Sequence, residues 1–112
     1  MTDDEKSKIR KDFGEAVNMA PAELEKWLET EESKEVGWPK DRDTGQESVG
    51  HHSGRRIVEI KHKKVADLTD DDYAHMRKVV GYVHRHLKQK PKGDISDTKW
   101  RYSLMNWGHD PK

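Results

Sequence analysis

The sequence predicts an all-α fold, a compact bundle of about five short helices with a long flexible polar loop at about residues 33–53. Apolar residues recur at spacings of three and four in several separate segments, which is the helical period. No segment alternates apolar and polar residues as a half-buried strand does. The 112 residues suit a single domain over 1–112, because domains usually contain about 50–250 residues.

The composition predicts a thin core. Hydrophobic residues make up 30% of the chain and charged residues 39%, against roughly 45–50% and about 25% in ordinary soluble domains. The absence of cysteine excludes disulfides, thiol catalysis and cysteine zinc sites. The acidic N-terminus resembles no secretory or transit signal, and no apolar run approaches the ~20 residues that span a membrane. We therefore expect a cytoplasmic protein.

The net charge of zero conceals two oppositely charged halves. Residues 1–47 contain 14 acidic and 8 basic residues, whereas residues 48–112 contain 8 acidic and 14 basic ones. The two halves either neutralise each other inside the fold or leave a basic face open to a polyanion.

The first predicted helix covers about residues 3–18. Ile9, Phe13, Ala16 and Val17 share one helical face. Acidic residues at positions 3–5 precede that face, and acids favour a helix N-terminus.

A second helix is expected at about 21–32, with Pro21 in its first turn. Leu24, Trp27 and Leu28 form its apolar stripe, and glutamates surround them. The loop at 33–53 follows, with too little apolar surface to offset the entropy of ordering. Trp38 within it either docks on the core or anchors a partner.

The third predicted helix covers about 54–65, with Ser53 as a possible cap and Ile57, Val58 and Ile60 as a partial stripe. The fifth begins near Ser96 or Asp97. Its apolar face consists of Trp100, Leu104 and Trp107, and Gly108 is placed to end it in the left-handed conformation.

The fourth helix has the strongest local signal. Thr69 suits the N-cap, and Asp72 three positions later makes a shortened capping box. Pro91 and Gly93 end the segment. Its apolar seam packs either inside the bundle or across a homodimer, and comprises Tyr73, Met76, Val80, Val83 and Leu87.

Catalytic and metal-binding patterns are missing from the sequence. The seven histidines contain no pair at the i, i+4 spacing of a helical zinc site, so we interpret them as solvated surface residues. Three consecutive aspartates, Asp70 to Asp72, are explained by a helix N-terminus. No nucleophile elbow, P-loop or dinucleotide fingerprint occurs. We expect no enzyme, no metal and no cofactor.

The basic half is more informative. Residues 55–64 contain five bases and one acid, and residues 77–92 contain six bases and no acid. On the fourth helix the bases at 77, 78, 85 and 88 fall within an arc of about 100°. Ala74 and Gly81 lie in the same arc, where small side chains allow a phosphate backbone or another helix to approach closely.

These bases predict weak, sequence-nonspecific binding to double-stranded DNA by a small nucleoid-type or accessory protein. A helix-turn-helix mode is disfavoured, because it would push the aspartates at the start of the fourth helix into the major groove. The other interpretation is an ordinary solvated face whose bases pair with the acidic half. The candidate DNA-binding residues are Arg55, Arg56, Lys61, Lys63, Lys64, Arg77, Lys78, Arg85 and Lys88.

A protein-interaction module or homodimer is the alternative function. It would use the acidic second helix, Trp38, the exposed side of Trp100–Trp107, or the seam of the fourth helix.

Five blocks in order resemble a family of small uncharacterised microbial proteins that carry a domain of unknown function. The resemblance covers nearly the whole chain and implies DNA binding, because members are often labelled DNA-binding proteins. It implies no catalytic residues. Where the family often has a threonine cap, this chain has Ala20, so the second helix is expected to fray at its start. The blocks are residues 18–28, 53–58, 67–72, 76–80 and 100–111.

Overall fold

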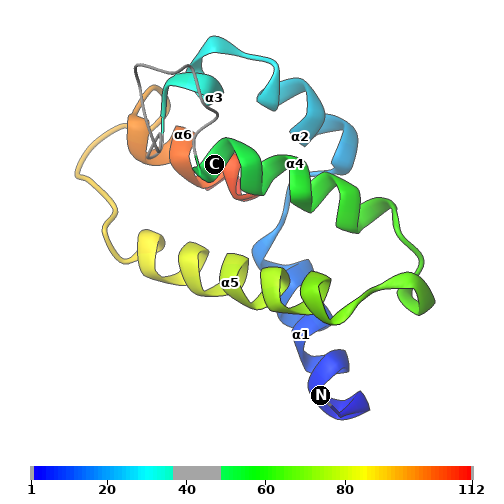
Figure 1. Ribbon diagram of the computed structural model, residues 1–112. Coiled ribbons are helices and arrows are strands. Elements are labelled where there is room, and N and C mark those ends of the chain that lie inside the picture. The colour runs from blue at the N-terminus through cyan, green and yellow to red at the C-terminus, as the bar shows by residue number, and fades with distance from the viewer. Residues whose placement is uncertain (1, 37–48, 112) are drawn as a thin grey trace.

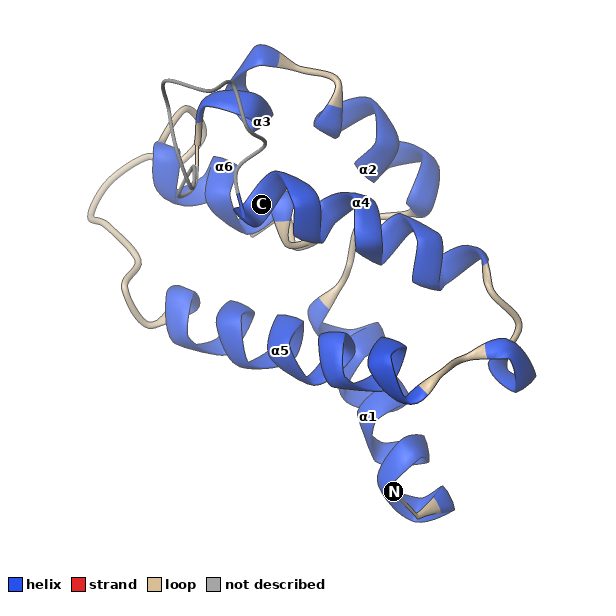
Figure 2. Ribbon diagram, viewed as in Figure 1, coloured by secondary structure: helices blue, strands red, loops and turns tan. Residues whose placement is uncertain are grey.

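Helices make up the regular structure of the described residues, 2–36 and 49–111, in the computed structural model (Figures 1 and 2). The prediction of an all-α fold is confirmed. The α-helices are α1 (Asp3–Ala16), α2 (Pro21–Leu28), α3 (Glu31–Glu35), α4 (Val49–His62), α5 (Asp70–Leu87) and α6 (Lys99–Asn106). A short 3₁₀ turn, Val65–Asp67, joins α4 to α5.

The helices form two groups. α1 crosses and packs against α5 on one side of the molecule, and α2, α3 and α6 gather around α4 on the other (Figure 1). Both groups contribute to one core, in which Leu24, Ile57, Val79 and Leu104 have no exposed surface.

Three of the five residues in the seam of the fourth predicted helix lie inside this core, and the other two, Val80 and Leu87, are partly buried against it. Tyr73, Met76 and Val83 are each at most 2% exposed and belong to the same core cluster as Ile9 and Phe13 of α1, the helix that packs against α5. Packing within the bundle is therefore confirmed, and a homodimer contact through these three side chains is wrong, since they are already covered.

Helix ends explain most of the boundaries. The capping box at the start of α5 is confirmed, because the Thr69 hydroxyl accepts from the Asp72 N–H and the Asp72 carboxylate accepts from the Thr69 N–H. Gly108 adopts the expected left-handed conformation, with φ of 80°. α6 is capped by Thr98 rather than by residues 96 or 97, because its hydroxyl accepts the N–H of Arg101.

The second predicted helix is two helices. α2 ends at Leu28, and Thr30 then caps α3 by accepting the Ser33 N–H. At the start of α2 the Glu23 carboxylate accepts the Ala20 N–H, which supplies part of the cap that alanine lacks.

The predicted loop at 33–53 was too long at both ends. α3 reaches into it, and α4 begins at Val49. Ser53 is therefore not a cap: it is buried within α4, where its hydroxyl lies 3.0 Å from Nε2 of His75. Trp38 lies outside the described residues.

Close packing around Gly54 joins the second group of helices. A Cβ atom at this position would lie 2.6 Å from Cδ2 of Leu28 and 2.7 Å from the carbonyl oxygen of Asn106, so only glycine fits. The fully buried Asn106 side chain accepts from Nε1 of Trp27, at 2.8 Å, and from the hydroxyl of Ser33. α2, α3 and α6 thus share one buried polar contact.

Candidate nucleic-acid interface

The exposed face of α5 is basic beyond its first turn. Arg77, Lys78, Arg85 and the C-cap Lys88 are exposed, and the small Ala74 and Gly81 lie in the same arc of the helix. We call these six residues the α5 basic face. The arc that the helical period predicted is therefore the solvent side of α5.

The four cations of the α5 basic face form no ion pair within the described part of the chain. Arg85 lies back over the helix, so that a Cβ atom on Gly81 would be 3.2 Å from its Nη1. Pairing of these four bases with the acidic half is thus not observed among residues 2–36 and 49–111.

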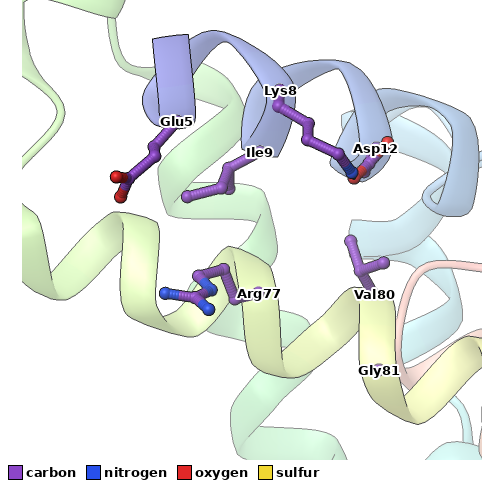
Figure 3. A pocket seen from close by; sticks show the side chains of 7 residues that line it. All are labelled: Glu5, Lys8, Ile9, Asp12, Arg77, Val80 and Gly81. Carbon is purple, nitrogen blue, oxygen red and sulfur yellow. The ribbon is translucent and has the colours of Figure 1, made fainter. Parts of the chain in front are cut away.

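α1, which contains five acidic and four basic residues, borders this face. Glu5 and Asp12 of α1 stand across a groove from Arg77 and Gly81 of α5 (Figure 3). α2 instead packs on α4 and α6, so its glutamates do not cover the α5 basic face.

Two predicted DNA-binding residues, Arg56 of α4 and Lys63 just after its end, point to a buried acid instead. Lys63 Nζ lies 2.8 Å from Oδ2 of Asp72, and Arg56 Nη2 lies 2.9 Å from Oδ1, without hydrogen-bond geometry. The Asp72 side chain has no exposed surface. Burial alone would raise its pKa, but hydrogen bonds from Lys63 and Thr69 outweigh burial and lower the pKa to about 2.

Lys61 is also drawn inward. Its Nζ lies 3.5 Å from the carbonyl oxygen of Val17, just beyond the end of α1, and 5.9 Å from the centre of the Phe13 ring. A cation suits the C-terminal end of a helix dipole. Burial lowers the pKa of Lys61. The remaining two bases of this segment, Arg55 and Lys64, are exposed, and Arg55 makes further contacts.

Several histidines are less exposed than the sequence predicts. Four of the seven are half-buried and hydrogen-bonded, so the interpretation as solvated surface residues is wrong for them. Their bonding partners are backbone carbonyls for three and a serine hydroxyl for the fourth. The four are His51, His75, His86 and His109.

The surroundings of His75 disfavour its protonated form. Burial and the nearby charges of Arg56 and Lys78 lower its pKa to about 4. Burial also lowers the pKa of His86. Among the described residues, no three histidine, aspartate or glutamate side chains gather to hold a metal ion.

Five rings form a nearly parallel column between α5 and α6. Trp107 stacks on Tyr82 with ring centres 4.2 Å apart, and Tyr82 stacks on His86 at 5.2 Å. His75 and Trp100 extend the column at its two ends. Trp107 is 5% exposed, and Trp100 donates its Nε1–H to the His86 carbonyl. Trp107 therefore offers almost no exposed surface to a partner, whereas Trp100 is half-buried.

The buried contacts of Asp72 and Asn106 were not predicted from the sequence. Asp72 was assigned only to a helix start, and Asn106 carried no local signal at all. Because their partners lie up to 79 residues away in sequence, helical periodicity could not have revealed them.

None of the described helices combines the length and the apolar character needed to cross a membrane. A family model described as a protein of unknown function (DUF3140) matches residues 12–105, from within α1 to the last turn of α6. No curated protein and no solved structure matches the chain. Since the matched region covers most of the chain, the protein belongs to the DUF3140 family.

Proposed function

We propose that the protein is a small nucleoid-type DNA-binding protein that contacts duplex phosphates through the α5 basic face. The observation that carries this proposal is that every charged residue exposed on α5 after its first turn is basic and lies outside any described ion pair. Cations free to replace condensed counterions are what nonspecific DNA binding needs.

The dimensions of the face fit a short stretch of backbone. Arg77 and Lys88 are eleven positions apart, which corresponds to about 16 Å along a helix. That distance is equivalent to about five base pairs of duplex. Ala74 and Gly81 lie in the same arc of the helix as the cations, and the Arg85 guanidinium extends over Gly81.

The acids at the start of α5 set the mode of binding. Asp70 and Asp71 are exposed there, and they would repel phosphates if this end entered the major groove. We therefore propose contacts from the exposed side and the C-terminal half of α5, without reading of bases. Arg56, Lys61 and Lys63 are left out of the proposed site because they have partners inside the fold.

Fluorescence anisotropy with a labelled random duplex at low salt tests the proposal. The double variant Arg77→Ala/Arg85→Ala is expected to bind at least tenfold more weakly than the wild type. The control Lys26→Ala/Lys34→Ala removes two exposed lysines from α2 and α3, and is expected to bind within twofold of the wild type. The proposal is wrong if the wild-type protein does not bind, or if both double variants lose affinity equally.

A further inference from the structure

A groove between α1 and α5 has a volume of about 460 Å³ (Figure 3). Ile9 and Val80 supply apolar side chains between the two helices, and Gly81 adds a position without a side chain. On α1 the lining runs from Glu5 to Asp12, seven positions apart, which corresponds to a length of about 10 Å.

The two sides of the groove carry opposite charges. Glu5 on α1 and Arg77 on α5 extend toward the same end of it (Figure 3). Neither forms an ion pair with a residue that the structure describes. At the other end Asp12 is held by Lys8, whose Nζ lies 2.7 Å from Oδ2, while Arg85 lies over Gly81.

The apolar floor and the opposite charges of the two sides determine which kind of partner fits the groove. A DNA strand would meet Glu5 and Asp12, so the groove itself is a poor place for phosphates. An amphipathic helix suits both the apolar floor and the oppositely charged sides of the groove, because it presents an apolar stripe with a charged flank on either side. Helices laid in a groove between two other helices are a recurrent form of peptide recognition.

We propose that the groove between α1 and α5 binds an amphipathic helix of a partner protein, with basic residues facing Glu5 and acidic residues facing Arg77. Large aliphatic side chains of that helix fill the space over Ile9 and Val80. Because Arg77 also belongs to the α5 basic face, the bound helix competes with DNA. The competition, unlike the helix binding, rests on the proposed function.

The test uses three synthetic helical peptides of about 15 residues, a length near the lower limit for a helix in water. All share one leucine stripe. One carries lysines on one flank and glutamates on the other, and the other two carry lysines only or glutamates only. Each labelled peptide is titrated with the full-length chain. The mixed peptide is expected to bind at least fivefold more tightly than either single-charge peptide.

Two charge reversals sharpen this expectation. Glu5→Lys makes both sides of the groove basic and is expected to transfer the preference to the glutamate peptide. Arg77→Glu makes both sides acidic and is expected to transfer it to the lysine peptide. Glu29→Lys, at an exposed position at the end of α2, is the control and leaves the preference for the mixed peptide unchanged. Circular dichroism of each variant verifies folding.

The outcomes separate this inference from the proposed function. If the mixed peptide does not bind, the helix site is wrong. It is also wrong if the wild type and both charge-reversal variants prefer the same peptide. Release of bound duplex by the mixed peptide supports the competition, and unchanged duplex binding at saturating peptide overturns it. If the wild-type protein binds no duplex, the DNA proposal fails while the peptide titrations still decide the groove.

Discussion

The ammonium group of Lys63 lies 2.8 Å from Oδ2 of Asp72, a carboxylate without exposed surface at the start of α5. Arg56 approaches the other oxygen of the same carboxylate. These two cations, one in α4 and one just after its end, thereby hold this segment against the N-terminal turn of α5, and they are removed from the positive surface. The candidate interface therefore contains fewer basic residues than the basic half of the sequence does.

Removing one member of this cluster should destabilise the fold. We expect Lys63→Ala to lower the free energy of unfolding by about 2 kcal/mol, because a buried carboxylate loses a charged hydrogen bond. Lys64→Ala changes the exposed neighbouring lysine and should stay within about 0.5 kcal/mol of the wild type. Urea denaturation measures both, and equal effects of the two variants would contradict the assigned role of Lys63.

The fold should lose stability in mild acid because of His75. Its pKa of about 4 lies below the ordinary value of 6.5, so the unfolded chain binds the proton first as the pH falls. Stability is therefore complete above about pH 6.5 and declines between 6.5 and 4. Because His75 is only half-buried, solvent screens part of its charge. We therefore expect the free energy of unfolding to fall by about 2 kcal/mol over this range.

The matched pair His75→Gln and His62→Gln isolates that contribution. His62 is exposed, so its replacement should leave the decline of unfolding free energy between pH 7 and 4.5 unchanged. Replacement of His75 should make the decline of unfolding free energy over the same pH range smaller. Parallel pH profiles for both variants would show that another group is responsible.

Two glycines should respond to alanine with opposite signs. Gly54→Ala places a methyl group against Leu28 and the Asn106 carbonyl, and we expect a loss of about 1–3 kcal/mol from overpacking. Gly14→Ala meets nothing within 4 Å on an exposed position of α1, and should stabilise by about 0.5–1 kcal/mol. Thermal unfolding curves distinguish the two, and a stabilising Gly54→Ala would contradict the close packing of α4.

Helical period and capping chemistry predicted the features that depend on residues close together in the sequence. They located the seam of α5 from Tyr73 to Leu87, the Thr69 cap and the left-handed Gly108. They also placed the cations of the α5 basic face in the correct arc. These features depend on neighbours within about four residues, which is the range over which sequence patterns act.

Long-range contacts accounted for the errors. Ser53 looked like a cap, but contact with His75 and the close approach at Gly54 draw this segment into the middle of α4. Arg56 and Lys63 looked like surface cations, yet the buried Asp72 attracts both. A sequence pattern gives the direction of a side chain on its own helix, whereas the partner depends on how helices pack.

The salt dependence of duplex binding tests the central claim most directly. Four phosphate contacts, one for each cation of the α5 basic face, predict a slope of log K against log salt of about −3.6 for the wild type. Arg77→Ala/Arg85→Ala should reduce its magnitude by about 1.8. The control Lys26→Ala/Lys34→Ala should leave it unchanged. Affinity that is independent of salt, or a slope unaltered by the loss of Arg77 and Arg85, would contradict phosphate binding by α5.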